Sequence, residues 1–291
     1  MSIKKKIKHA ISFLLHGEPK QVTAKIVTLA PSELLKDRCA LITGGTSGIG
    51  FSIAEAFLKA GVKGVVITGR SQEKIDSACK KLSKYGVCLG VVMDNTKVSM
   101  FSDTFESVLL SLKQKGIEKI DILVNNAGVL GGTMPNAKEE EYDRILDTNL
   151  KGVFFLSQLF CNYMVVNNIK GNVLNIASSS SLRPAISAYT LSKWGIRGLT
   201  LGVARSYAEY GITVNGLAPG PTATPMLVSE DNKNLFNNKI PLGRYALPEE
   251  IANMAVFLVS DMGHSIIGDI VYMTGGAGLV CYDDYNYNLK F

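Results

Sequence analysis

Hydrophobic and polar residues follow two rhythms that alternate along the chain from about residue 38 to residue 275. One is the short apolar run, rich in β-branched side chains, that is typical of a buried strand. The other repeats apolar residues every three or four positions, as in Ile49, Ile53 and Phe57, and predicts amphipathic helices. Because the two rhythms take turns, we expect strands and helices to alternate along the fold.

The pattern predicts seven strands, at Arg38–Thr43, Gly64–Thr68, Val87–Met93, Ile120–Asn125, Asn172–Ala177, Thr213–Ala218 and Asp269–Thr274. The predicted helices are Ser47–Ala60, Gln72–Lys84, Phe101–Lys115, Lys138–Val165, Ala188–Tyr210 and Pro248–Ser260. Crossover helices between parallel strands cover both faces of the sheet. The expected fold class is therefore α/β, a single doubly wound Rossmann-type domain with a seven-stranded parallel sheet. Such a sheet binds its ligands at the carboxyl ends of the strands.

Composition is compatible with one such domain. Of the 291 residues, 46% are hydrophobic, enough for one large core. No Pro-, Gly- or Ser-rich linker divides the pattern. We therefore predict a basic N-terminal arm over residues 1–35, the Rossmann-type domain over residues 36–280 and a C-terminal tail over residues 281–291.

Positive charge is concentrated in the predicted arm. The first twenty residues carry a net charge of +4, out of +6 for the whole chain, so the domain has no basic stripe for nucleic acid. Apolar residues on one helical face, such as Ile3, Ile7 and Ile11, would allow residues 1–16 to lie on an anionic membrane. We favour the alternative of an arm that is solvated or packs on the domain or a neighbouring subunit, because a short basic amphipathic pattern is weak evidence.

A glycine-rich turn follows the first predicted strand and opens the first helix. Glycines permit a tight turn and a close approach of the main chain, while free N–H groups and the helix dipole attract phosphate. The spacing differs from Gly-x-Gly-x-x-Gly, but the position after the first buried strand favours a dinucleotide site. The residues predicted to bind the cofactor here are Gly44, Thr46, Ser47, Gly48, Ile49 and Gly50.

The ends of the next strands bear on the choice of cofactor. The second strand ends in Arg70, and no carboxylate occurs before Glu73 to bind both ribose hydroxyls as in NAD-preferring sites. A guanidinium suits a 2′-phosphate, so we predict NADP(H); if Arg70 is only a solvated residue, NAD(H) is the alternative. Asp94 either accepts a hydrogen bond from adenine or caps a turn. The segment after the fourth strand either borders the adenosine or forms a turn; its residues are Asn126, Ala127 and Gly128.

The predicted catalytic groups lie at the ends of later elements. Tyr189 and Lys193 are one helical turn apart, and an ammonium so placed would lower the phenol's pKa, which is ordinarily about 10. The phenol can then exchange a proton with a substrate oxygen. Ser178, with Ser179 in reserve, would hydrogen-bond that oxygen. Asn149, inside a predicted helix, is either a surface residue or the anchor of a water that relays protons to Lys193.

Other chemistries find little support in the sequence. The histidines His9, His16 and His264 are far from these motifs, which argues against a Ser-His-Asp hydrolase. No cluster has metal-ligand spacing, and no Gly-Lys-Ser/Thr phosphate loop occurs. The five cysteines are scattered and none forms Cys-x-x-Cys, so we expect a reduced, cytoplasmic protein.

Together these motifs resemble the short-chain dehydrogenase/reductase family over about residues 36–276. The resemblance rests on the glycine-rich turn, Asn125-Asn126-Ala127-Gly128, Asn149, Ser178, Tyr189, Lys193, Asn215, and Pro219-Gly220 with Thr222 and Thr224. It implies a catalytic set of Asn149, Ser178, Tyr189 and Lys193. It further implies that Pro219, Gly220, Thr222 and Thr224 touch the nicotinamide, and that Tyr189 and Lys193 also contact the cofactor. A homodimer or homotetramer formed through the long helices is also implied.

The sequence departs from the family pattern in some places. The interval from Ser178 to Tyr189 is about two residues shorter than usual, and the common Asp-Gly-Gly appears as Thr274-Gly275-Gly276. The resemblance does not cover the arm and the tail.

We therefore expect an NADP(H)-dependent oxidoreductase that interconverts a carbonyl and a secondary alcohol of a small molecule. The substrate stays open: a 3-oxoacyl group on a carrier protein, a steroid, and a sugar or polyol are all compatible with residues 226–247, which mix apolar residues with asparagines. Two alternatives are a non-catalytic NADP-binding sensor or scaffold and an NAD-dependent epimerase or dehydratase. The second alternative usually has a different glycine spacing and a larger C-terminal lobe.

Overall fold

The computed structural model describes residues 31–225 and 235–278. Seven strands form one parallel sheet in the order β3-β2-β1-β4-β5-β6-β7. The strands are β1 (Cys39–Ile42), β2 (Gly64–Gly69), β3 (Val87–Val92), β4 (Ile122–Asn125), β5 (Gly171–Ile176), β6 (Ile212–Pro219) and β7 (Ile270–Met273). The order reverses direction between β1 and β4, which is where doubly wound folds bind their ligands. The predicted fold class is confirmed.

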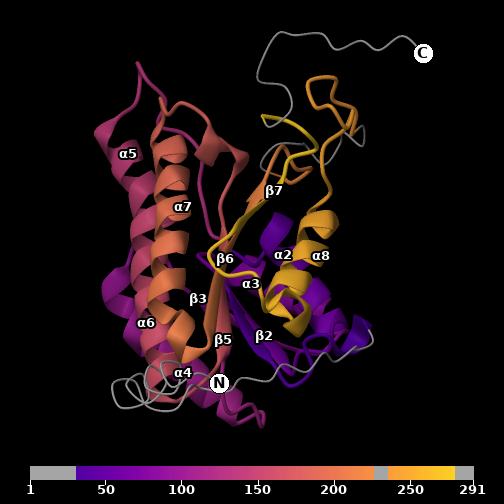
Figure 1. The fold of residues 1–291 in the computed structure, drawn as a ribbon. Coiled ribbons are helices and arrows are strands. Elements are labelled where there is room, and N and C mark those ends of the chain that lie inside the picture. The colour runs from indigo at the N-terminus through magenta and orange to yellow at the C-terminus, as the bar shows by residue number, and fades with distance from the viewer. Residues whose placement is uncertain (1–30, 226–234, 279–291) are drawn as a thin grey trace, which may run out of the picture. The chain divides into compact units, whose positions relative to one another are not determined.

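Helices cover both faces of the sheet (Figure 1). On one face lie α2 (Gly48–Lys59), α3 (Gln72–Leu82) and α8 (Pro248–Val259), and on the other α4 (Phe101–Lys113), α5 (Glu139–Leu146), α6 (Gly152–Val166) and α7 (Ala188–Tyr207). Short 3₁₀ helices occur at Pro31–Glu33, Val98–Met100, Ser179–Leu182, Ala208–Tyr210 and Asp261–Gly263. None of the helices in the described ranges is long and apolar enough to span a bilayer.

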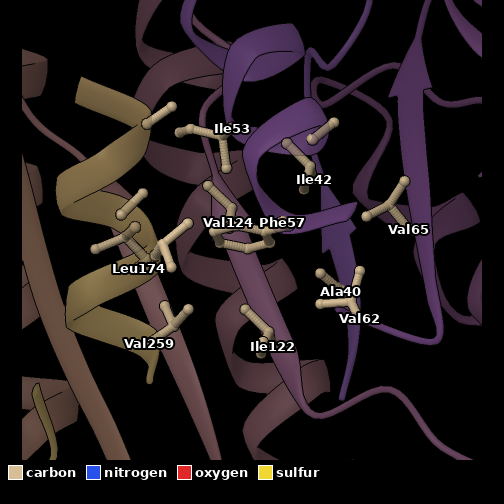
Figure 2. Packing of buried hydrophobic residues seen from close by; sticks show 14 of the residues in the cluster. Ala40, Ile42, Ile53, Phe57, Val62, Val65, Ile122, Val124, Leu174 and Val259 are labelled. Atoms are coloured by element: carbon tan, nitrogen blue, oxygen red, sulfur yellow. The ribbon is translucent and has the colours of Figure 1, made fainter. Parts of the chain in front are cut away.

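Strand β1 shows why the strands are apolar throughout. Ala40 and Ile42 pack into the core under α2 and α8, whereas Cys39 and Leu41 pack into the core under α4 and α6. Successive side chains of a strand point to opposite faces, and both faces are covered by helices, so every position must be apolar. Figure 2 shows the first of these cores, where Phe57 lies among Val124, Ile122 and Ile53.

The helix predicted over Lys138–Val165 is wrong in one respect. It is divided into α5 and α6 by a π-helical turn at Asp147–Lys151. Gly152, directly after the turn, packs so closely that a Cβ there would lie 2.3 Å from the carbonyl oxygen of Asn95. The apolar rhythm predicted one continuous helix here because it does not distinguish a single π-turn from the α-helix on either side.

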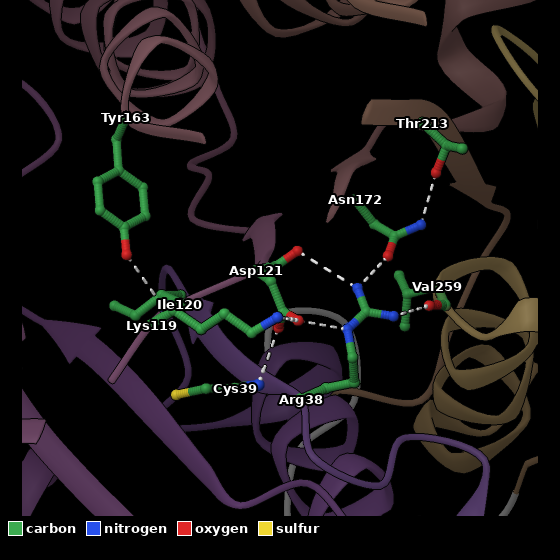
Figure 3. Close-up of polar contacts among 9 residues, drawn as sticks. All are labelled: Arg38, Cys39, Lys119, Ile120, Asp121, Tyr163, Asn172, Thr213 and Val259. Carbon is green, nitrogen blue, oxygen red and sulfur yellow. Dashed lines mark hydrogen bonds and ion pairs between the residues drawn. The ribbon is translucent and has the colours of Figure 1, made fainter. Parts of the chain in front are cut away.

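The amino ends of the strands are joined by a polar network centred on Asp121 (Figure 3). The Nε of Arg38 donates to Asp121 Oδ2 at 2.6 Å, and the main-chain N–H of Cys39 donates to Asp121 Oδ1 at 2.9 Å. Arg38 Nη2 also donates to Asn172 Oδ1 at 2.5 Å, and Asn172 Nδ2 donates to Thr213 Oγ1 at 2.5 Å. Four neighbouring strands, β1, β4, β5 and β6, are tied together in this way.

The predicted terminal segments fall largely outside the described residues. Residues 1–30 of the predicted arm, residues 279–291 and residues 226–234 are among those not described. Leu35, at the end of the predicted arm, is fully buried in the core, and its N–H donates to Ala60 O at 2.9 Å.

Candidate active site

A cleft of about 510 Å³ opens at the carboxyl ends of the strands. It runs past the ends of β2, β1, β4, β5 and β6, so residues far apart in sequence share one wall. Every residue that the sequence predicted for cofactor binding or catalysis lines this cleft, except Gly50 and Asn149. The predicted cofactor and catalytic residues are therefore brought to one place, as expected for the carboxyl edge of a doubly wound sheet.

The main-chain conformation and the close packing of the glycine-rich turn both favour glycine. Gly44 and Gly48 have φ angles of +65° and +56°, a region that other residues rarely adopt. A Cβ at Gly44 would lie 2.9 Å from Ala127 Cα, and one at Gly50 would lie 2.4 Å from Asn126 Nδ2. Gly50 is thus needed for packing under the turn, although it does not line the cleft.

Asn126 fixes the loop after β4 to the glycine-rich turn after β1. Its Nδ2 donates to the carbonyl oxygens of Thr43 at 2.9 Å and Gly44 at 3.1 Å. In return the hydroxyl of Thr43 accepts from the main-chain N–H groups of Asn126 and Ala127, both at 3.0 Å. These hydrogen bonds fix the loops after β1 and β4 to each other at the point where the strand order reverses direction.

The walls of the cleft contain polar groups that the folded chain leaves without partners. Thr68 Oγ1 and Asn95 Nδ2 are buried, belong to lining residues and have no hydrogen-bond partner among the described residues. Burying such groups costs free energy unless a ligand or water satisfies them. With the glycine-rich turn, they fit a nicotinamide dinucleotide, whose adenosine would lie between the ends of β2 and β3.

Two lining residues flank that adenosine end. Arg70 is exposed at the end of β2, and its guanidinium has no hydrogen bond or ion pair with other described residues. Asp94 Oδ1 accepts from the N–H and the hydroxyl of Thr96, both at 3.0 Å. The turn-capping role weighed for Asp94 is therefore present, while the residue still lines the cleft.

At the other end of the cleft, Tyr189 lies in the first turn of α7. The helix starts there because Ser187 caps it, accepting from the N–H of Thr190 at 3.1 Å. The hydroxyl of Ser178, which follows β5, is close enough to the phenol of Tyr189 to lower its pKa. One turn further along α7, Lys193 Nζ lies 5.7 Å from the centre of the Tyr189 ring.

Burial controls the proton affinity of both groups. It raises the pKa of Tyr189, and the hydrogen bond with Ser178 acts in the opposite direction. The expected lowering of the Tyr189 pKa by Lys193 is not found; Lys193 Nζ donates to Ile176 O at 2.8 Å. Burial lowers the pKa of Lys193 itself from 10.5 to about 8. At neutral pH the phenol is thus protonated and able to donate.

Asn149 occupies the π-turn and is buried, so the surface alternative for it is wrong. Its Oδ1 accepts from the N–H of Val129 at 2.8 Å, and its Nδ2 donates to Val129 O at 2.9 Å. Nδ2 also lies 3.2 Å from the hydroxyl of Ser192. Asn149 therefore joins α7 to the loop that carries Val129 into the cleft. A role in anchoring a relay water stays a prediction.

The segment after β6 closes the cleft opposite the glycine-rich turn. Gly220 is required, because a Cβ there would lie 2.7 Å from Thr274 Cα. The hydroxyl of Thr222 donates to Gly220 O at 3.0 Å, and Thr224 lies against Gly48. Pro219, Gly220, Thr222 and Thr224 all line the cleft, as predicted.

Sequence reasoning missed one charged lining residue, Arg183, which lies between Ser178 and Tyr189. A signal was available, since the segment from the end of a strand to the start of the next helix borders any ligand at that edge. Among the described residues no group of three or more His, Cys, Asp or Glu side chains could hold a metal.

The sequence and the fold of this chain are both similar to those of known proteins. The family model for short chain dehydrogenase matches residues 38–235. The chain belongs to the short-chain dehydrogenase/reductase family. Its resemblance to that family, stated from motifs alone, is confirmed. Family members are oxidoreductases that interconvert CH–OH and C=O groups of small molecules with a nicotinamide cofactor.

Relatives with different substrates share the whole domain. The chain is 34% identical to a 3-oxoacyl-[acyl-carrier-protein] reductase of Rickettsia conorii, over 84% of this chain and 99% of the relative. It is 31% identical to gluconate 5-dehydrogenase of Gluconobacter oxydans, over 81% and 93%. A solved structure of actinorhodin polyketide ketoreductase with NADPH is 30% identical, with a TM-score of 0.75 over 83% of this chain and 97% of that one.

Proposed function

We propose that this protein is an NADP(H)-dependent oxidoreductase that reduces a carbonyl group to a secondary alcohol, or runs the reverse reaction, with Tyr189 as acid and base. The observation that carries the proposal is the neutral phenol of Tyr189 in the first turn of α7, close to the hydroxyl of Ser178 and one turn before the buried Lys193. A protonated group in a partly desolvated cleft is what a forming alkoxide requires.

Each residue of the set has a distinct task. Tyr189 donates its proton to the substrate oxygen during reduction and takes it back during oxidation. Ser178 donates a hydrogen bond that orients and polarises the carbonyl. Lys193, held by the carbonyl of Ile176, binds the ribose next to the nicotinamide. When bound, the nicotinamide supplies or accepts the hydride. Asn149 holds the loop of Val129 against α7 through its hydrogen bonds.

Ser178 is the better candidate for the catalytic serine than Ser179. Its hydroxyl is the one that acts on the pKa of the Tyr189 phenol. The same hydroxyl accepts from the N–H of Ser180 at 3.1 Å, which fixes its orientation. The shortened interval between Ser178 and Tyr189 is thus compatible with contact between the two side chains.

Preference for NADP(H) is supported by Arg70. Its guanidinium lies on the cleft beside Thr46 and Ser47, and no described carboxylate neutralises it. A 2′-phosphate would receive charge-assisted hydrogen bonds there, whereas the ribose of NAD(H) would find no carboxylate at the end of β2. The relative solved with NADPH has the same fold, which is compatible with this choice.

Assembly into a homodimer or homotetramer forms part of the proposal. Phe154 and Phe155 of α6 and Trp194 and Leu201 of α7 are exposed. These two helices lie side by side (Figure 1). Large apolar side chains on adjacent helices are typical of a surface that a second subunit covers. A cytoplasmic location and a membrane contact through residues 1–16 both remain predictions.

Cofactor binding and turnover test the proposal together. Isothermal titration of NADPH and NADH into wild type, Arg70→Ala and the control Arg205→Ala should show an NADPH affinity that falls roughly 10-fold or more in Arg70→Ala alone. NADPH oxidation over a panel of carbonyl compounds should fall about 10²- to 10⁴-fold in Tyr189→Phe. Binding without turnover would favour the sensor alternative, and no binding would overturn the proposal.

A further inference from the structure

Arg183 is the one charged residue of the cleft that the proposed function does not use. Arg70 is assigned to the 2′-phosphate and Lys193 to the ribose, and Asp94 caps a turn. Arg183 lines the same cleft, is exposed, and makes no side-chain hydrogen bond or ion pair with the residues that the structure describes. An arginine without a carboxylate partner at the wall of a binding cleft is available for an anion.

The main chain of Arg183 is held firmly, although its side chain has no hydrogen bond or ion pair within residues 31–225 and 235–278. Its N–H donates to Ser180 O at 3.1 Å, and its carbonyl oxygen accepts from the indole Nε1 of Trp194 at 2.8 Å. Pro184 follows and restricts the backbone further. The guanidinium is therefore presented from a fixed base, which lowers the entropy lost when it binds a ligand.

The guanidinium lies against Gly278, which follows β7. A Cβ at Gly278 would be 2.9 Å from Nη2 and 3.2 Å from Nε of Arg183, so the guanidinium packs directly on the main chain of residue 278. The φ angle of Gly278, +78°, favours glycine. The space next to the main chain of residue 278 is thus occupied by the positive charge of Arg183.

Arg183 follows β5 and contacts the segment after β7, so it lies on the other side of the switch point between β1 and β4 from Arg70. Strand β7 is four strand positions from β1, which precedes the glycine-rich turn, and five from β2, which ends at Arg70. With about 4.8 Å between neighbouring strands, β7 lies roughly 19 Å from β1 across the sheet. Arg183 instead belongs to the end of the cleft where Ser178 and Tyr189 lie.

We propose that Arg183 binds a carboxylate of the substrate, so that the protein reduces oxo acids, or oxidises the corresponding hydroxy acids, in preference to neutral carbonyl compounds. This inference rests on the proposed function and specifies its substrate class. In the described part of the cleft, the only carboxylate is that of Asp94, at the adenosine end, so nothing there competes for Arg183. The bidentate guanidinium would fix one end of the substrate while Ser178 and Tyr189 hold its carbonyl oxygen.

The test uses pairs of substrates that differ only in charge. The probes are methyl-ketone acids of the form CH₃CO(CH₂)nCOO⁻, from acetoacetate to 6-oxoheptanoate, each with its neutral methyl ester. In the wild type, kcat/KM for at least one acid should exceed that of its ester, and the best chain length reports the span from Tyr189 to Arg183. Arg183→Gln should lower kcat/KM for that acid roughly 10- to 100-fold, mainly through KM, and leave the ester within about twofold.

Two further variants sharpen the result. Arg183→Lys retains the charge without the bidentate geometry and should recover part of the preference for the acid. Arg205→Gln removes an exposed arginine that does not line the cleft and should leave both compounds unchanged. An equal effect of Arg183→Gln on acid and ester, or a wild type that prefers the ester at every chain length, would overturn the inference and leave the proposed function standing.

Binding provides a readout that does not depend on turnover. Titration of the same acids into the wild-type complex with NADP⁺ should give saturable binding that Arg183→Gln weakens, while the esters bind no more weakly to the variant than to the wild type. Saturable acid binding without turnover of any compound would contradict the reductase proposal but support the carboxylate site. The absence of Arg183-dependent acid binding would overturn the site itself.

Discussion

The two ends of the sheet use the same kinds of residue for opposite purposes. At the amino end, Arg38 is bonded to Asp121 and Asn172, and the network continues to Thr213. At the carboxyl end, Arg70 and Arg183 have no partner among the described residues, and the buried polar atoms of Thr68 and Asn95 are unsatisfied. The difference indicates that a polar residue in this fold is structural when the chain satisfies it and available for a ligand when the chain does not.

The comparison has a physical basis. A buried charge without a partner costs several kcal/mol, so the fold can leave polar groups unpaired only where solvent or a ligand reaches them. At the amino end Asp121 and Asn172 are buried, whereas the carboxyl ends of the strands border the open cleft. Substitutions at the amino end should therefore affect folding, and substitutions at the carboxyl end should affect binding and chemistry.

The largest expected effect on folding is that of Asp121→Ala. It removes the acceptor for Arg38 Nε and for the N–H of Cys39, leaving a largely buried guanidinium without its charge partner. We expect the free energy of unfolding, measured with urea, to fall by about 3 to 5 kcal/mol. Asp103→Ala, which alters an exposed aspartate of α4, should change it by less than about 0.5 kcal/mol. A loss below about 1 kcal/mol for Asp121→Ala would mean that the network is not structural.

Lys193 should differ from Asp121 in its effect on folding. Burial of its charge lowers the stability of the folded chain instead of raising it. Its pKa is about 8 in the folded chain and 10.5 ordinarily, so below pH 8 both states are charged and the cost of burial is complete. Between pH 8 and 10.5 the unfolded chain binds a proton that the folded chain does not, and stability rises with pH. Relative to Lys193→Met, the wild type should gain about 3 kcal/mol over this range. A constant difference between the two proteins would contradict the buried ammonium.

A smaller effect on folding is expected at the π-turn. Asn149→Leu keeps the side chain's bulk but leaves the N–H and the carbonyl of Val129 without their partners. The unfolding free energy should fall by about 1 to 3 kcal/mol. Because Val129 lines the cleft, kcat should fall as well. Gln158→Leu, at an exposed position of α6, provides the control. If Asn149→Leu were as stable as the wild type, Asn149 would not anchor this loop.

Much of this architecture could be predicted from the sequence because its causes are local. Apolar runs such as Cys39–Ile42 and the helical rhythm after Gly48 are sufficient to indicate a parallel sheet. Tyr189 and Lys193 are one helical turn apart in any α-helix, so their common face was certain once the helix was predicted.

The parts that could not be predicted depend on contacts between distant segments. Asn149, in the π-turn, bonds to Val129 and Ser192, which belong to other elements. Burial, which raises the pKa of Tyr189, is likewise invisible in a Tyr-x-x-x-Lys motif. Arg183 was overlooked because no motif marks it; its importance comes from Gly278, almost one hundred positions later, and from the lack of a described partner.

The smallest expected effect on folding belongs to the arginines of the cleft, and it is the sharpest test of the comparison. Arg38→Ala should lower the free energy of unfolding by about 3 kcal/mol, since it removes the 2.6 Å ion pair of the buried Asp121 carboxylate and leaves only the longer one to Lys119, at 3.5 Å. Arg70→Ala and Arg183→Ala remove side chains without partners in the described structure, so each should change it by less than about 0.5 kcal/mol. Urea unfolding of the three variants without cofactor measures this directly. Repeating it with saturating NADPH should destabilise Arg70→Ala relative to the wild type, because weaker binding to the folded state stabilises it less. Equal losses for Arg38→Ala and Arg70→Ala in the absence of cofactor would mean that the two ends of the sheet do not differ in the way that their hydrogen bonds indicate.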